Sequence, residues 1–149
     1  MDKSDVVSTL NDLIETCKDG EEGFRNCAEN ISDSELKSYF TNRAQRCSTA
    51  AAELQDVVEE YGGKPETSSS ISSALHRRWV DIKSAVTGKD DESILNECER
   101  GEDVAKRSYE NALSKDLPDE VRSLVERQYQ GVMQNHDQVK SLRNQARGH

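Results

Sequence analysis

The fold of this chain is decided by residues 62–90, which read GGKPETSSSISSALHRRWVDIKSAVTGKD. The run Gly62-Gly63-Lys64-Pro65 predicts the end of one helix, and Asp90 or Asp91 can cap the start of the next. Between them, apolar spacing over 71–87 predicts a shorter helix of about 17 residues, roughly 25 Å long. Neighbouring helices in a plain up-and-down bundle need only about 2 to 8 connecting residues. This connection is therefore long enough to carry the chain back along a bundle.

The sequence before this connection contains two long amphipathic segments. Apolar positions recur at alternating spacings of four and three over residues 6–31 and again over 36–61, where Ala50 and Val57 belong to the pattern. Such spacing is typical of helices that pack along a heptad seam. Between the segments, Ser32-Asp33-Ser34-Glu35 predicts a capping box that starts at Ser32. A turn this short makes the two helices antiparallel neighbours.

The sequence after the connection predicts two further long helices. One covers about 91–113, and Pro118-Asp119-Glu120 predicts the start of the last, whose apolar positions run through 121–142. The chain is therefore expected to be all-α, a four-helix bundle with a long crossover that contains a fifth, shorter helix. This is the single-crossover, ferritin-like arrangement. We expect residues 1–149 to form one such domain.

The composition excludes several classes of partner. The chain has 149 residues, with 20 basic and 29 acidic side chains and a net charge of −9. This acidic balance argues against non-specific binding to nucleic acid or to an anionic membrane. No apolar run approaches the roughly 18 residues that a membrane span requires, and the first five residues do not resemble a signal peptide. We expect a cytoplasmic protein without a nucleic-acid or membrane partner.

Four glycines lie inside the predicted helices, at positions 20, 23, 101 and 131. Counting helical levels from the predicted turns places all four in one slab of the bundle. Each costs about 1 kcal/mol relative to alanine in a helix, so a compensating gain is expected there. The same slab contains a set of polar residues: Glu21, Glu22, Arg43, Arg46, Glu99, Glu102 and Gln128. Residues that disfavour a helix and polar residues thus occur together at this level. A site or an unusual packing arrangement is expected at such a place.

A di-metal centre is one interpretation of this slab. Such centres in helix bundles use inward glutamates from two helices and Glu-x-x-His from the other two. Glu21 and Glu102 fit the first half of this pattern, but the sequence contains no Glu-x-x-His. The second helix offers Arg43 and Arg46 instead, and a guanidinium repels a cation rather than binding it. The weak candidates for metal ligands are Glu21, Glu99, Glu102, Gln128 and His136.

A buried polar network is the preferred interpretation. In it Glu21 and Glu102 pair with Arg43 and Arg46, and Gln128 joins them. The glycines make room for the arginine side chains or for Trp79. This interpretation predicts no cofactor. Such a network fixes the register of the helices more than it adds stability. Iron or manganese is the alternative cofactor, and a small-ligand pocket is a third interpretation.

The four cysteines, Cys17, Cys27, Cys47 and Cys98, lack C-x-x-C spacing, which argues against a zinc or thioredoxin-like centre. All four lie on seam positions. The level count places Cys17 near Cys47 and Cys27 near Cys98, so disulfides are geometrically conceivable. In a cytosolic bundle we expect buried free thiols.

Several stretches resemble a family of small bacterial proteins that is known as a domain of unknown function in the ferritin-like superfamily. They are LNDLIE at 10–15, KDGEEGF at 18–24, ALHRRW at 74–79, ECERGED at 97–103 and NHD at 135–137. The resemblance runs over nearly the whole chain. It implies a ferritin-like four-helix bundle and no established activity. The wider superfamily binds di-iron or manganese, but this chain departs from that pattern because it lacks Glu-x-x-His.

Two hypotheses for function follow. The first is a non-enzymatic stress-related or interaction protein with an absent or degenerate metal centre, which associates with itself as a homodimer or a larger homo-oligomer. The alternative is a metal-dependent oxidase or iron-handling protein that uses the candidate ligands in an unusual site. The sequence contains no signature of a serine nucleophile, a phosphate loop or a nucleotide fingerprint, so we lean away from an enzyme.

Overall fold

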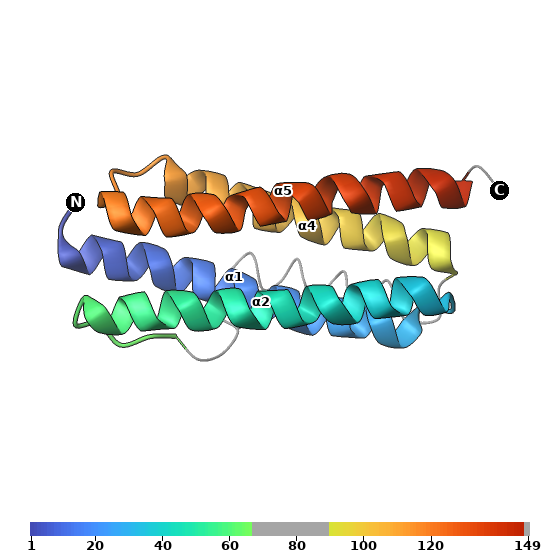
Figure 1. The fold of residues 1–149 in the computed structure, drawn as a ribbon, viewed down its shortest axis with the longest axis horizontal. Coiled ribbons are helices and arrows are strands. Elements are labelled where there is room, and N and C mark those ends of the chain that lie inside the picture. Colours follow the sequence, from blue (N-terminus) through green and yellow to red (C-terminus); the bar gives the residue numbers. More distant parts are fainter. Residues whose placement is uncertain (67–89, 148–149) are drawn as a thin grey trace.

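The computed structural model describes residues 1–66 and 90–147. Within them lie four long helices, α1 (Lys3–Asn30), α2 (Ser34–Glu60), α4 (Asp91–Leu113) and α5 (Asp119–Arg147) (Figure 1). The long helices predicted from apolar spacing are confirmed. The shorter helix predicted over 71–87 lies outside the described residues. None of the described helices is both long enough and apolar enough to cross a membrane.

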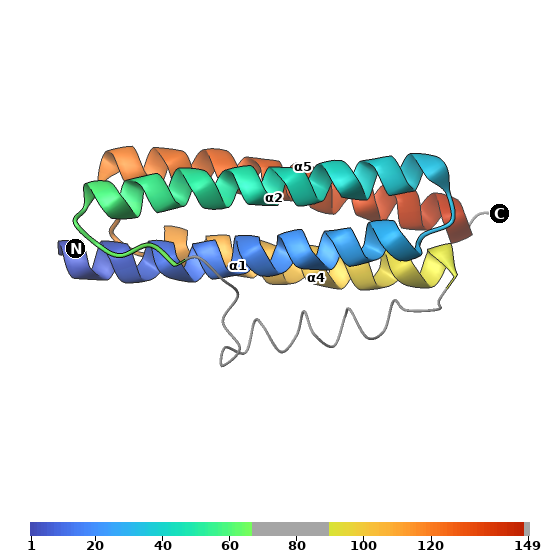
Figure 2. The same ribbon diagram turned by 90° about the horizontal axis from the view of Figure 1, so that it is seen from below.

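The helices form a bundle with a ferritin-like chain path. Close backbone contacts join α1 to α2, α4 to α5, and α1 to α4, and the members of each pair run in opposite directions (Figures 1 and 2). Helices α2 and α4 run in the same direction, so α2 ends at the opposite end of the bundle from the start of α4 (Figure 1). This placement of the end of α2 and the start of α4 is the one that the predicted single-crossover arrangement requires.

The turn between α1 and α2 differs from the predicted capping box by one residue. Asp33, not Ser32, is the N-cap, and its carboxylate accepts hydrogen bonds from the backbone N–H groups of Glu35 and Leu36 at 2.9 and 3.1 Å. Ser32 is engaged elsewhere, because both its N–H and its hydroxyl donate to the Asp91 carboxylate at 2.8 Å. The first residue of α4 thus fixes the α1–α2 turn and competes with the predicted cap.

Gly62 and Gly63 end α2 in a Schellman motif. Gly62 has φ +75°, a left-handed conformation that glycine adopts without strain. The Gly62 N–H donates to the carbonyl of Glu59 and the Gly63 N–H donates to that of Val58, both at 2.9 Å. The predicted end of this helix is confirmed.

The core consists of two apolar clusters, one toward each end of the bundle. The first includes Phe24, Phe40 and Ile94, and the second includes Leu10, Leu54 and Val121. The predicted seam of α1 is buried as expected, but α2 buries Ala51 and Val58 while Ala50 and Val57 stay partly exposed. A strict seven-residue repeat drifts around a helix of 3.6 residues per turn, which moves the buried stripe by one position.

Candidate functional site

A layer of buried polar side chains lies where the two apolar clusters meet. Its members are Arg43 on α2, Glu102 on α4, and Gln128 and Asn135 on α5, and each is 9% exposed or less. We call these four residues the polar layer. Gly20, Gly23 and Gly101 are buried, and Gly131 is partly exposed. Buried polar groups destabilise a core unless they are hydrogen-bonded, so the partners of each member decide what the layer does.

Arg43 and Glu102 form an ion pair across the core from α2 to α4. Arg43 Nη2 and Nε lie 3.0 and 3.2 Å from Glu102 Oε1. The guanidinium carbon also lies 4.9 Å from the centroid of the Phe24 ring, within range of a cation–π interaction. Among the described residues, Glu102 Oε2 has no hydrogen-bond partner. One carboxylate oxygen thus accepts both contacts from the arginine.

The surroundings of this pair shift the pKa of both groups. Burial raises the pKa of Glu102, and the neighbouring Arg43 guanidinium only partly opposes that shift. Burial acts to lower the pKa of Arg43, but attraction to Glu102 outweighs it and the pKa rises above its ordinary value. Arg43 therefore stays charged in the core. A fixed positive charge at this carboxylate repels a second cation.

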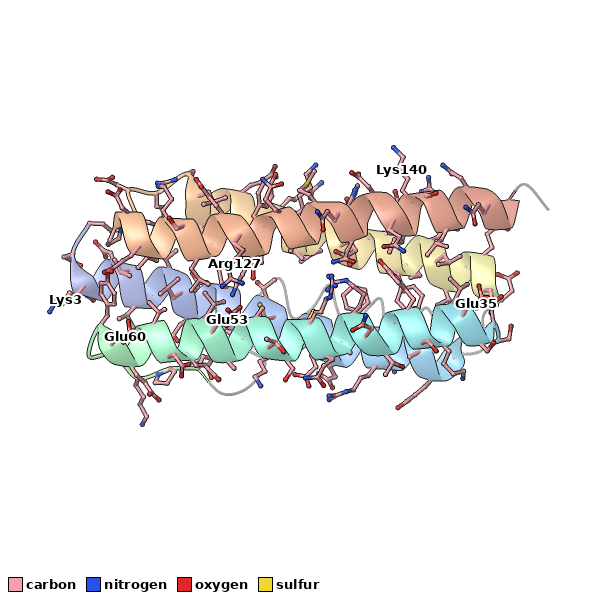
Figure 3. All side chains as sticks on the ribbon, in the orientation of Figure 1. Lys3, Glu35, Glu53, Glu60, Arg127 and Lys140 are labelled. Carbon is pink, nitrogen blue, oxygen red and sulfur yellow. The ribbon has the colours of Figure 1, made fainter. Side chains whose placement is uncertain are left out.

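A chain of hydrogen bonds connects α4, α5 and α2 through Gln128. The Tyr109 hydroxyl donates to Gln128 Oε1 at 2.8 Å, and Gln128 Nε2 donates to Glu53 Oε1 at 3.2 Å and to the Ala50 carbonyl at 3.3 Å. Glu53 Oε2 pairs with Arg127 Nη2 at 2.7 Å. Figure 3 shows Arg127 and Glu53 facing each other from α5 and α2. These contacts hold together two helices that make few close backbone contacts.

Cys17 extends the same chain of contacts to α1. Its sulfur lies 3.3 Å from the Tyr109 hydroxyl, and the side chain is buried. Since that hydroxyl donates to Gln128, the thiol is the group that donates to Tyr109. Burial raises the pKa of Cys17 to about 11. The thiol is therefore protonated at neutral pH and acts as a hydrogen-bond donor, not as a nucleophile.

A pocket of about 310 Å³ opens between α2 and α5 and reaches into the polar layer. Residues of all four helices line it, and several of them are small: Gly20, Ala50, Ala105 and Gly131. Apart from the adjacent residues and the neighbouring backbone of α5 itself, a Cβ atom at Gly131 would meet no atom of the described residues within 4 Å. We call this cavity the α2–α5 pocket. Two of the four glycines of the predicted slab, Gly20 and Gly131, thus line this open space.

Glu21 and Arg46 lie outside the polar layer. Glu21 pairs along its own helix, with Arg25 at 2.8 Å and Lys18 at 3.9 Å. Arg46 is exposed and lines the α2–α5 pocket, and it makes no ion pair with any residue that the structure describes. The structure therefore brings together Arg43 and Glu102 from the proposed network, with Gln128 nearby, and leaves Glu21 and Arg46 at its edge.

The remaining candidate ligands, Glu99 and His136, each contact a partner on another helix. Glu99 on α4 forms an ion pair with Arg143 on α5. His136 Nε2 on α5 lies 2.6 Å from Asp103 Oδ1 on α4, and His136 is partly buried. Both contacts connect α4 to α5 beside the polar layer.

The residues at this level do not fit a di-metal centre. Glu102, Glu21 and Glu99 are each held by an arginine. Within residues 1–66 and 90–147, no group of three or more His, Cys, Asp or Glu side chains is placed to hold a metal ion. Carboxylates that are ion-paired to guanidinium groups are poor ligands, because the arginine must first be displaced.

All four cysteines are free thiols in the structure. Cys17, Cys27 and Cys98 are buried and Cys47 is partly exposed, where it lines the α2–α5 pocket. Burial raises the pKa of Cys47 to about 12 and raises that of Cys98 well above its ordinary value. Cys47 and Cys98 therefore stay protonated at neutral pH and pack with the apolar core.

Sequence reasoning missed two hydroxyl groups that complete the site. Tyr109 supports Gln128, and the Tyr39 hydroxyl donates to Asn135 Oδ1 at 3.2 Å. Tyr109 lies four residues after Ala105, so the apolar stripe of its helix already contained the signal. Tyr39 flanks the seam position Phe40, and nothing in the spacing pointed it toward Asn135.

The fold and the polar layer together define an all-α, ferritin-like four-helix bundle with an arginine–glutamate pair in its core. The chain belongs to the family described as "Domain of unknown function (DUF2383)", whose model matches residues 5–115. Among solved structures, the chain is similar to the crystal structure of a DPS protein from Vibrio cholerae O1, described as a member of a broad superfamily of ferritin-like diiron-carboxylate proteins. That match has a TM-score of 0.75 at 15% identity and covers 94% of this chain and 89% of the other. No curated protein sequence matches the chain.

Proposed function

We propose that this chain is a non-enzymatic, ferritin-like binding protein in which an ion pair stands at the level where a metal centre would have to form. The contact of Arg43 with Glu102, at 3.0 Å in the buried core, is the observation that carries this proposal. A fold supports many activities, so function has to be argued from the site. Here the site contains a fixed cation where a di-metal centre needs anionic ligands.

The proposal includes self-association, as a homodimer or a larger homo-oligomer. Four-helix bundles leave long helix faces at the surface, and closed symmetric pairing of such faces is the commonest form of assembly. Sedimentation equilibrium of the purified chain measures this directly. We expect a mass at least twice that of one chain, and a single-chain mass over the micromolar range would refute this part of the proposal.

An iron-handling role is the second candidate, because the similar Vibrio cholerae protein is described as one of the diiron-carboxylate proteins. That role would require metal to displace Arg43 from Glu102. The two candidates therefore differ in one measurable quantity, the amount of metal that the folded chain retains.

The test is metal retention by the purified protein. The chain is incubated anaerobically with excess ferrous iron, and separately with Mn²⁺, then desalted and analysed for metal content. The rate of ferrous iron oxidation in air is measured in parallel. We expect far less than one metal ion per chain and no acceleration of iron oxidation, because the Arg43 charge opposes cation entry.

Glu102→Gln and Glu126→Gln serve as matched variants in this test. Glu102 is buried in the polar layer, and Glu126 is an exposed carboxylate on α5. Retention of one or two metal ions by the wild type and the Glu126 variant, with loss in the Glu102 variant, would replace our proposal with the iron-handling role. Equal, low retention in all three supports the proposal.

A further inference from the structure

The α2–α5 pocket has the properties of a small-molecule site. Its volume of about 310 Å³ lies at the lower end of the range of ligand pockets, roughly 300 to 1,000 Å³. It is a pocket of the bundle core rather than a surface dimple, because α1 and α4 also contribute to its wall through residues such as Gly20 and Ala105.

Gly131 indicates that packing alone does not explain this space. A glycine inside a helix costs about 1 kcal/mol relative to alanine, and it is usually retained where a neighbouring atom would clash with a Cβ. At Gly131, an added Cβ would meet nothing within 4 Å among the described residues beyond its chain neighbours and the adjoining backbone of α5. Position 131 therefore has a glycine although a larger side chain would fit there and would begin to fill the pocket.

The wall of the pocket favours an apolar ligand body. Phe24 and Val132 line it with apolar surface. The polar groups of Tyr109 and Gln128 are already engaged with each other and with α2. Because these groups have partners in the protein, a ligand does not need to supply hydrogen bonds inside the pocket.

The mouth of the pocket carries an unbalanced positive charge. Three arginines line the pocket, and two of them are paired: Arg43 with Glu102, and Arg127 with Glu53. Arg46 is exposed and has no ion-pair partner in the described part of the chain. The chain as a whole carries −9, so this cationic mouth runs against the general charge of the protein. A positive charge at the mouth of the pocket favours binding of an anionic ligand.

We propose that the α2–α5 pocket binds a small molecule with an apolar body and one anionic group, with the apolar body beside Gly131 and the anion at Arg46. This inference goes beyond the proposed function and does not depend on whether the core retains metal. A carboxylate or a sulfonate on an aromatic or aliphatic body fits this chemistry.

Two fluorescent probes that differ by one charge test the proposal. The anionic probe is 8-anilinonaphthalene-1-sulfonate, and the neutral one is N-phenyl-1-naphthylamine, which lacks the sulfonate. Both are titrated against the folded wild type, with helix content followed by circular dichroism. We expect saturable binding of one probe molecule per chain, and tighter binding of the anionic probe.

Variants separate the two parts of the proposed site. Gly131→Leu fills the pocket and should weaken both probes at least tenfold. Arg46→Gln should weaken the anionic probe about tenfold and leave the neutral one unchanged, and Arg46→Lys should restore the anionic probe. Arg107→Gln is the matched control, since Arg107 is an exposed arginine on α4 that does not line the pocket. It should change neither titration.

The outcomes that overturn the proposal are equally definite. Absence of saturable binding by the wild type refutes the site, as does unchanged binding in folded Gly131→Leu. Equal weakening of both probes by Arg46→Gln, or no weakening of either, refutes the anion position. If Gly131→Leu does not fold, amide shifts in a two-dimensional NMR titration of the wild type decide, because they must centre on residues 131 and 132.

Discussion

Helix α2 packs against α1 on one side and faces α5 on the other, and the two interfaces are built differently. The α1–α2 seam is close and apolar, with Phe24 stacked on Phe40 at 6.0 Å between ring centroids. The α2–α5 side has few close backbone contacts and is bridged by polar pairs, such as Arg127 with Glu53 at 2.7 Å. One helix thus contributes both to a closed seam and to an open pocket.

The two sides of α2 are therefore stabilised by different interactions. Burial of apolar surface at roughly 25 cal/mol per Å² stabilises the closed seam, and similar apolar residues can replace one another there. The polar layer, which borders the α2–α5 side and includes the ion pair of Arg43 on α2 with Glu102 on α4, depends on particular partners, because a buried charge that loses its partner is costly. Substitutions should therefore behave differently on the two sides.

The largest expected effect is at the core ion pair. Arg43→Met leaves the Glu102 carboxylate buried without its partner and should lower the free energy of unfolding by about 3–5 kcal/mol. The double variant Arg43→Met with Glu102→Leu removes both charges and should regain most of that loss. Urea unfolding followed by circular dichroism measures all three proteins.

Leu10→Ala and Val58→Ala provide the comparison in the closed seam. Both residues are fully buried in one apolar cluster. The Leu10 variant should lose about 2–5 kcal/mol, and adding the Val58 truncation should increase the loss, not reverse it. If the Arg43 double variant also loses more than the single variant, the pair is not a compensated unit and the contrast between the two sides fails.

The second expected effect is a loss of stability at alkaline pH through Cys17. Its pKa is raised to about 11 in the folded chain by burial. A group whose pKa is raised by folding stabilises the native state below its unfolded pKa, and this stabilisation is lost as pH rises toward the folded pKa. Between about pH 9 and 11 the wild type should therefore lose about 2–3 kcal/mol from this group.

Cys17→Ser and Cys17→Ala identify the thiol as the cause. Neither variant titrates at this position in that range, and the serine retains a donor for Tyr109. The difference in free energy of unfolding between the wild type and Cys17→Ser should change by the stated amount from pH 8 to pH 11. A constant difference would mean that the Cys17 thiol, which lines the α2–α5 pocket, is hydrated in the folded chain.

Most residues on the predicted seams are buried, although Ala50 and Val57 on α2 stay partly exposed, and the burial of residues beside the seams could not be predicted from spacing. Gln128 occupies a seam position and is buried, as is Glu102, which directly follows the seam position Gly101. Glu21 and Arg46 also lie one residue from a seam position, Gly20 and Cys47 respectively, but they lie outside the polar layer. One residue turns a helix by about 100°, so spacing alone does not decide which flanking residue points inward.

The exact helix ends and the pocket depend on contacts between residues that are distant in the sequence. The α4 boundaries follow from Asp90 and the apolar period, but the shift of the α2 cap to Asp33 depends on Asp91, which is distant in sequence. The glycine slab indicated the right level of the bundle. Glycines can let helices pack closely or can leave a pocket between them. Which of the two occurs here depends on the distance between α2 and α5, and no local sequence pattern determines that distance.

The smallest expected effect is at Gly131, and it has the opposite sign. Because an added Cβ has room there, Gly131→Ala should raise the free energy of unfolding by about 1 kcal/mol through helix propensity. Gly63→Ala is the matched change beside the closed seam, where the added Cβ would lie 2.6 Å from Val7 Cγ1. It should lower stability by about 1–3 kcal/mol, as overpacking does.

Thermal and urea unfolding of the two alanine variants measure this contrast directly. Opposite signs at Gly131 and Gly63 would mean that the open side keeps unused space while the seam between α1 and α2 has none. A loss of stability in Gly131→Ala would mean instead that the space is closed in solution. The α2–α5 side would then be packed like the α1–α2 seam, and the pocket would have no room for a ligand.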